Sequence, residues 1–302
     1  EKGEIDESSI PAKDFDRFQN HKVLDIYRYY ALSYTYFAFN LKKPEFKDIR
    51  VRQAIAYAID KSVIVKGVLK GFGQLAHLPA SPVSWAYPQD GTQIFEYDPS
   101  KSRQLLEQVG YKYNGKTNLL EKNGKPFEFT IVTNKGNKDR EKAAQIIQRY
   151  LSDIGIKVNI QLMEWSAFIK IVNENIDPKK YDAVILGWSL GLDPDGYTIW
   201  HSSQYPKGFN FIGYQNQEVD QLLKKGRLET KQYVRKGIYS KLFNTIAQDI
   251  PYIFLYYPES LVGINKRVRG LSKPGPAGLM NEIESECDGK VVEEGPANLP
   301  RH

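Results

Sequence analysis

Two patterns in the sequence predict an α/β protein, and length and composition set its size. Segments typical of strands and helices alternate from Phe127 to Leu186, which is the rhythm of β-α-β units in a layered fold. The run from Ala183 to Leu186 is entirely apolar, as in a strand that is buried on both faces of a sheet. With 302 residues, of which 41% are hydrophobic and 26% are charged, the chain has the composition of a globular protein with one large domain or two moderate ones.

One strand, two helices and a loop are predicted in the first third of the chain. Tyr34 to Phe39 is rich in aromatic residues and is typical of a strand. Asp48 precedes a helical segment that extends through Ile59. Its apolar face consists of Val51, Ala54, Ile55, Ala58 and Ile59. Asp60 begins a second helix that runs through Val68, and the prolines between Pro79 and Pro88 predict an extended loop.

The remaining elements follow from helix-start signals, turn signals and periodicity. Asp98-Pro99 begins a helix, because an acid at the N-cap followed by Pro is a strong start signal. Asn123-Gly124 predicts a hairpin turn before the strand that starts at Phe127. Further helices are predicted over 139–151, 165–172, 217–225 and 231–247, and further strands over 158–162, 252–257 and 261–264.

Charge and composition argue against several classes of protein. The net charge is +6, but Lys and Arg are spread along the chain without a basic block interleaved with aromatics, so no nucleic-acid partner is expected. Cys287 is the one cysteine, and without a Cys/His cluster neither a metal site nor a cofactor is expected. No run of about 18 apolar residues predicts a membrane span. The polar start at Glu1 shows no signal peptide, so we expect a cytosolic protein or one whose N-terminal segment has been removed.

The segment that follows the buried strand is the best candidate for a binding site. Gly187 to Gly196 offers glycines, a tryptophan and two acids directly after the strand. Open α/β sheets bind ligands at the carboxyl ends of their strands. The loop contains no evident pair of nucleophile and base, and no Ser/His/Asp spacing, nucleophile elbow or phosphate loop occurs elsewhere in the chain. We therefore expect a site that holds a solute without transforming it.

Four segments, in this order and spacing, resemble the family 5 extracellular solute-binding proteins, which are the receptors of dipeptide, oligopeptide and nickel ABC importers. The segments are Gly3-Glu4-Ile5-Asp6, the stretch from Asp48 to Lys61, Tyr97-Asp98-Pro99 with its helix and Gly110-Tyr111, and the segment with Trp188 and Asp193-Pro194-Asp195. The resemblance covers residues 1 to about 284. It implies a periplasmic-binding-protein-like α/β fold of type II, cluster C.

The resemblance also implies how the chain is divided. Family members are longer, and the matching part is their C-terminal portion. We expect residues 1–23 to be a remnant of lobe one, residues 24–257 to form lobe two with a ligand-binding wall, and residues 258–302 to return to lobe one and end in an irregular tail. A lipid anchor would then belong to the missing N-terminal part, and the protein would be extracytoplasmic, in the periplasm or on the outer face of the cell membrane.

Five residues are the candidate ligand contacts: Trp188, Ser189, Leu190, Gly191 and Asp193. Amphipathic Trp rings suit wet clefts, although Trp188 could instead pack beneath the loop. Peptide-binding relatives place an Asp a few residues after this Trp, where it pairs with the peptide's amino group. The corresponding positions are Ser189, Leu190 and Gly191, so Asp193 takes over that role, the ligand's terminus is held differently, or the ligand is not a short peptide. Acids that flank Pro also form turns, and we favour that role for Asp193.

Other conspicuous side chains have structural explanations. We interpret Arg50 and Arg52 as solvated surface residues at a helix start, and His201 as a structural histidine.

The resemblance thus implies a non-enzymatic, monomeric receptor component that captures a small solute and delivers it to an ABC permease by closure of two lobes. A peptide is the expected solute. The alternatives are the same fold with an oligosaccharide or a metal chelate as ligand, and a hydrolase.

Overall fold

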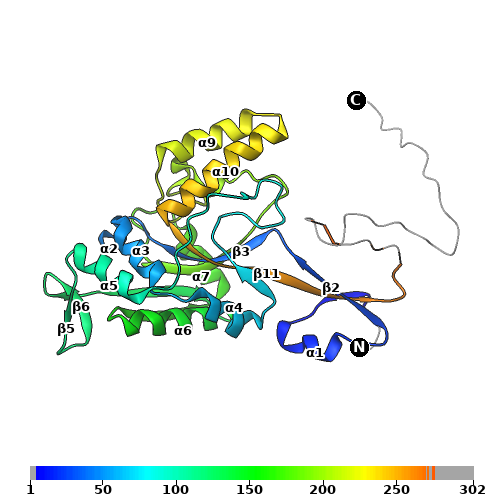
Figure 1. The fold of residues 1–302 in the computed structure, drawn as a ribbon, viewed down its shortest axis with the longest axis horizontal. Helices are drawn as coiled ribbons and strands as arrows, with labels where there is room; N and C mark the ends of the chain where they lie inside the picture. Colours follow the sequence, from blue (N-terminus) through cyan, green and yellow to red (C-terminus); the bar gives the residue numbers. More distant parts are fainter. Residues whose placement is uncertain (1–4, 270, 272–273, 276–302) are drawn as a thin grey trace. The chain divides into compact units, whose positions relative to one another are not determined.

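Figure 1 shows the computed structural model, which describes residues 5–269, 271 and 274–275. Gly3 and Glu4 of the first motif, the tail after Glu286 and Cys287 lie outside the described residues. Contacts between residues divide the chain into two compact units, one from Tyr30 to Glu259 and one from the residues before and after that range.

A mixed sheet forms the centre of the larger unit. Its strands are β3 (Ser33–Phe39), β4 (Gly73–Leu75), β8 (Glu128–Asn134), β9 (Lys157–Met163), β10 (Ala183–Ser189) and the part of β11 (Tyr252–Asn265) before residue 260. The order is β11-β3-β10-β8-β9, and β4 also pairs with β11. β8 runs parallel to β9 and β10, whereas β3 is antiparallel to β10 and β11. A separate three-stranded sheet consists of β5 (Lys112–Asn114), β6 (Leu119–Lys122) and β7 (Lys125–Pro126).

Helices surround this sheet, and three of them begin at the aspartates that the sequence marked as helix starts. They are α2 (Pro44–Lys47), α3 (Ile49–Tyr57), α4 (Lys61–Leu69), α5 (Pro99–Gln108), α6 (Lys138–Asp153), α7 (Trp165–Asn173), α8 (Tyr197–Trp200), the 3₁₀ turn η2 (Ser202–Gln204), α9 (Gln217–Leu228) and α10 (Gln232–Asp249). The carboxylates of Asp48, Asp60 and Asp98 accept hydrogen bonds from the first turns of α3, α4 and α5. α9 and α10 pack side by side, as Figure 1 shows.

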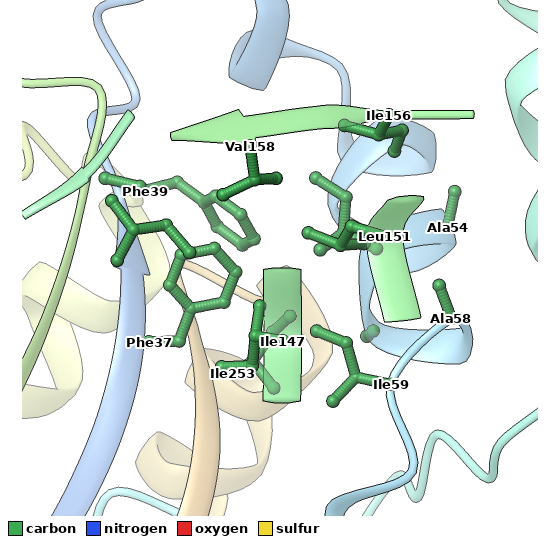
Figure 2. Packing of buried hydrophobic residues seen from close by; sticks show 14 of the residues in the cluster. Phe37, Phe39, Ala54, Ala58, Ile59, Ile147, Leu151, Ile156, Val158 and Ile253 are labelled. Atoms are coloured by element: carbon green, nitrogen blue, oxygen red, sulfur yellow. The ribbon is translucent and has the colours of Figure 1, made fainter. Parts of the chain in front are cut away.

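Apolar side chains cover both faces of the sheet. One core contains Phe37, Phe39 and Ile185 with residues of α3, α4, α5 and α6. Figure 2 shows Phe37 and Phe39 near Ile147 and Leu151 of α6. The other core contains Tyr36 and Leu186 with residues of α7, α8, α9 and α10. Because successive side chains of a strand point to opposite faces, a strand that is covered on both faces must be apolar on both, as in residues 36–39 of β3 and 183–186 of β10. The α/β class predicted from the apolar run in β10 is confirmed.

The smaller unit consists of short elements around the end of β11. They are β1 (Glu7–Ser9), the 3₁₀ turn η1 (Ala12–Asp14), α1 (Phe15–Phe18) and β2 (Leu24–Tyr30). β1 is antiparallel to β11 from Glu7 opposite Ile264 to Ser9 opposite Val262. Asp6 of the first motif accepts a 2.5 Å hydrogen bond from Arg267 Nε.

Two strands are longer than the local sequence predicts. β10 continues beyond Leu186 through Ser189, because β3 pairs with it over its whole length. β11 is one strand of 14 residues, where the sequence predicted two. An irregularity between Phe254 and Tyr256 shifts its register against β3 without ending the strand.

The interpretation of Arg52 as a surface residue is wrong, because its side chain is buried. Nε donates to the carbonyls of Asp249 (3.2 Å) and Ile250 (3.0 Å), and Nη2 also donates to Asp249 (2.6 Å). Nη1 donates to the carbonyls of Phe46 (2.7 Å) and Lys47 (3.1 Å). The guanidinium therefore satisfies the C-terminal carbonyls of both α2 and α10. Arg50, by contrast, is exposed and pairs with Asp48 at 2.6 Å.

We predict that Arg52→Met lowers the free energy of unfolding by about 3 kcal/mol, because it leaves buried carbonyls without donors. Urea denaturation measures the change. Arg50→Met is the matched control, because it removes an arginine from the exposed side of the same helix and should leave the unfolding midpoint almost unchanged. Equal losses in the two variants would contradict the role given to Arg52.

Candidate functional site

The end of β10 carries the candidate site. Its pairing with β3 continues to Ser189 opposite Ser33, but its pairing with β8 covers only Ala183 and Val184. Past the end of β10, Leu190 N donates to Leu32 O at 2.6 Å. Because Leu32 directly precedes β3, this N–H faces the β3 side of β10. The last three residues of β10 are therefore held by one neighbouring strand only.

The direction of the backbone groups follows from alternation along the strand. Because Leu190 N faces the β3 side, Trp188 N faces it as well. Ile185 O faces β8, where it accepts a 2.8 Å hydrogen bond from Thr133 Oγ1. The N–H and C=O groups of Gly187 and Ser189 therefore point to the β8 side, beyond the last residue paired there. We call this row of groups the open edge of β10.

A cavity of about 220 Å³ lies next to the end of β10. All five candidate residues line it: Trp188, Ser189, Leu190, Gly191 and Asp193. The rest of its lining consists of Leu32, Pro79, Ala80, Ser84, Pro194, Asp195, Gly196, Thr198, Ile199, Trp200, Phe209 and Phe243. Apart from the residues of the loop itself, these lining residues could not be recognised as site residues from the sequence. The prolines between Pro79 and Pro88 marked a loop but gave no sign that it faces β10.

Trp188 is half-buried, and aromatic rings surround it. Its ring is stacked on Tyr36 at 6.3 Å and lies edge-on to Phe209 at 5.7 Å. Phe209 itself is 48% exposed. Trp188 Nε1 has no hydrogen-bond partner in the described structure. Trp188 thus both packs against the core and lines the cavity, so it combines the two roles considered from the sequence, packing beneath the loop and facing a cleft.

Two arginines neutralise the acids of the loop. Arg235 Nη2 donates to Asp193 Oδ1 at 2.9 Å, and Asp193 Oδ1 also accepts from the N–H of Asp195 at 3.0 Å. Arg227 Nε and Nη2 both lie 2.7 Å from Asp195 Oδ2. The other carboxylate oxygen of Asp195, Oδ1, accepts from the N–H of Tyr197 at 3.0 Å. The Arg235 hydrogen bond lowers the pKa of Asp193 below its usual value. Asp193 therefore forms the expected turn and an ion pair besides lining the cavity.

Arg140 lies near the open edge of β10. A side chain at Gly187 would come within 3.0 Å of Arg140 Nη2, so the glycine makes room for the guanidinium. Arg140 Nη1 donates to Asn134 Oδ1 at 2.9 Å, and burial lowers the pKa of this arginine. Arg140 thus brings a positive charge to the carboxyl ends of β8 and β10.

Lys61, from the second motif, has a structural role. Its Nζ donates to the carbonyls of Ala76 (2.6 Å) and Phe254 (3.0 Å) and lies 3.4 Å from His77 Nδ1. Burial lowers the pKa of Lys61 to about 7, and burial together with Lys61 lowers the pKa of His77 to about 4. The adjoining cavity of about 20 Å³ has room for a single water. Lys61 therefore joins the start of α4 to β11.

His201 is buried and stacks on Tyr197 at 4.2 Å, as expected of a structural histidine. Its Nδ1 lies 2.8 Å from Ser203 Oγ and 3.9 Å from Asp220 Oδ1. Serine and acid thus meet the same ring nitrogen, whereas a catalytic triad needs them on opposite nitrogens.

Neither a metal-binding cluster nor a membrane span occurs in the described part of the chain. Over those residues, no three His, Cys, Asp or Glu side chains gather closely enough to hold a metal ion. None of the described helices combines the length and apolarity needed to cross a membrane.

The comparison with protein families and curated proteins gives consistent results. The family model for bacterial extracellular solute-binding proteins, family 5 Middle, matches residues 1–210. The oligopeptide-binding protein AppA of Bacillus subtilis is 42% identical over 272 residues, which is 89% of this chain and 49% of that protein. Heme-binding protein A of Haemophilus influenzae is 31% identical over 245 residues, which is 80% of this chain and 42% of that protein. The chain thus spans about half the length of these relatives.

Solved structures share the fold. The structure of AppA from Bacillus subtilis in complex with a nonapeptide has a TM-score of 0.83 at 40% identity and covers 92% of this chain and 55% of that one. NikZ from Campylobacter jejuni in complex with Ni(L-His) has a TM-score of 0.78 at 31% identity, and the match covers 92% of this chain and 56% of that one. These structures confirm the predicted fold. The assignment of residues 1–23, 24–257 and 258–302 to lobes stays a prediction.

We predict a coupling of about 0.5 kcal/mol between Asp193 and Arg235, which is typical of a partly exposed ion pair. A double-mutant cycle with Asp193→Asn and Arg235→Gln measures it from unfolding free energies. Because the folded-state pKa of Asp193 is lowered, the coupling should be complete above about pH 5 and disappear as the pH falls through that pKa. A coupling that does not decrease at a pH low enough to protonate Asp193 would contradict the ion pair.

Lys61 should make the chain more stable as the pH rises from about 7 to about 10. The folded chain releases the lysine proton near pH 7, whereas the unfolded chain keeps it to about pH 10.4. The unfolded state then binds more protons, so the free energy of unfolding increases with pH. Urea denaturation at pH 7 and 9.5 should show the advantage of the wild type over Lys61→Met growing at the higher pH. A constant difference would refute the lowered pKa.

Proposed function

The chain belongs to the family 5 extracellular solute-binding proteins, and we propose that it acts as the receptor component of an ABC importer with peptides as its solutes. The relatives support peptides: AppA is named as an oligopeptide-binding protein, and its structure is a complex with a nonapeptide.

The open edge of β10 is the observation that carries the proposal. An extended peptide can add to such an edge through main-chain hydrogen bonds, which do not depend on the peptide's sequence. The N–H and C=O groups of Gly187 and Ser189 supply matching donors and acceptors.

The cavity next to the open edge suits part of a peptide. At about 220 Å³ it is smaller than the pockets of about 300 Å³ or more that enclose whole small ligands. Along an extended chain, alternate side chains point to opposite sides, so one of them would enter the cavity while its neighbours point away. Trp188, Phe209 and Ile199 would accept apolar side chains of various shapes.

A metal chelate is the second candidate solute. NikZ is described in complex with Ni(L-His), and another relative is named as a heme-binding protein. A chelate brings its own donor atoms, so it would not need a metal-binding cluster of the protein. We favour a peptide because a chelate would make no use of a row of main-chain donors and acceptors.

The partners and the location of the protein follow from this role. The receptor would close two lobes around the peptide and deliver it to an ABC permease in the membrane. We propose that it works outside the cytoplasm as a monomer, held by a lipid anchor, and that it catalyses no reaction.

We predict that a randomised nonapeptide pool, added at millimolar total concentration to the ¹⁵N-labelled chain, shifts the amide NMR signals of residues 186 to 191 most strongly. A matched pool with alternate backbone N-methyl groups should cause much smaller shifts, because it has lost half of its main-chain donors. Ni(L-His) at the same concentration tests the second candidate.

The variant Ser189→Pro tests the same edge from the side of the protein. It removes an N–H that faces away from β3, so thermal unfolding should change little while the shifts caused by the pool decrease. Undiminished shifts with both the variant and the N-methylated pool would refute binding at the open edge.

A further inference from the structure

The acids at the rim of the cavity are already paired within the protein. Asp193 and Asp195 are the acidic residues that line it. The side chain of Arg235 that pairs with Asp193 is only 18% exposed, so this guanidinium is fixed in place. Arg235 also donates to Gly226 O at 2.9 Å and lies 5.5 Å from the ring of Trp85. Two negative and two positive charges leave the rim without net charge.

Asp195 is paired through both of its carboxylate oxygens. One of its oxygens lies 2.7 Å from two nitrogens of Arg227, and the other accepts a backbone N–H. Arg227 in turn lies over the ring of Tyr197 at 4.0 Å. A carboxylate that turned toward a ligand would give up bonds to its arginine, and an ammonium group at the remaining oxygen of Asp193 would still meet the charge of Arg235.

This arrangement determines which ligand group the cavity accepts. An ammonium group that leaves water for a half-buried site needs a carboxylate that is not yet neutralised. Next to Asp193 or Asp195, it would also meet the positive charge of Arg235 or Arg227 within a few ångströms. A neutral amide or an apolar side chain meets neither penalty.

We propose that the cavity takes an uncharged segment of the ligand and does not anchor a free α-amino group. N-acylated peptides and the interior residues of long peptides are then as good ligands as peptides with a free N-terminus. This inference rests on the proposed function, because it specifies which peptides bind at the same site.

Paired peptides test the inference directly. The probes are a randomised nonapeptide pool with free N-termini and the same pool after N-acetylation, compared at about pH 6.5, where the α-amino group is protonated. NMR titration of the signals of residues 186 to 191 should give apparent Kd values within about threefold of each other. A loss of more than about threefold on acetylation overturns the inference. If neither pool binds, the proposed function itself fails and the inference falls with it.

A new acid in the cavity should make the site prefer peptides with a free α-amino group. Gly191 has space for a side chain, because its nearest neighbours would lie 3.7 Å and 3.9 Å from an added Cβ atom. Gly191→Asp places a carboxylate without a partner there, and the free pool should then bind about tenfold more tightly than the acetylated pool. Gly191→Asn has the same size without the charge and separates charge from bulk. An absence of preference in Gly191→Asp would overturn the electrostatic explanation.

Discussion

The candidate site depends above all on the antiparallel pairing of β10 with β3. The two strands pair at seven positions, from Ala183 opposite Phe39 to Ser189 opposite Ser33. β3 lies in the middle of the sheet and is buried almost completely, so it is a rigid support. It carries the last residues of β10 past the point where β8 stops pairing. The same pairing produces the open edge and brings Trp188 to the cavity.

Four cationic side chains hold the surroundings of the site in place. Arg52 and Lys61 donate to backbone carbonyls at the ends of helices and along β11, and they join segments that are far apart in sequence. Arg227 and Arg235 fix the loop after β10 through Asp195 and Asp193. A receptor wall that is preorganised in this way loses little conformational freedom when a ligand binds, which favours affinity.

The local features of the fold could be predicted from the sequence, but its long-range features could not. Asp48, Asp60 and Asp98 marked helix starts because capping depends on neighbouring residues. The extension of β10 was missed because Gly187 and Ser189 are poor strand formers, and only the distant β3 holds them in the sheet. Arg52 looked like a surface residue because two of its four acceptor carbonyls lie 197 and 198 positions away. The same limit applies to Asp193, whose arginine is 42 positions further along the chain.

The central claim is that a peptide binds to the open edge of β10 through its main chain. Amide hydrogen exchange with and without the nonapeptide pool tests it most directly, because N–H groups along the strand alternate between the two sides. The account predicts slower exchange at Gly187 and Ser189 when the pool is added, with no change at Trp188 and Leu190, which already face β3. Equal slowing at all four amides, or slowing at Trp188 and Leu190 alone, would contradict it.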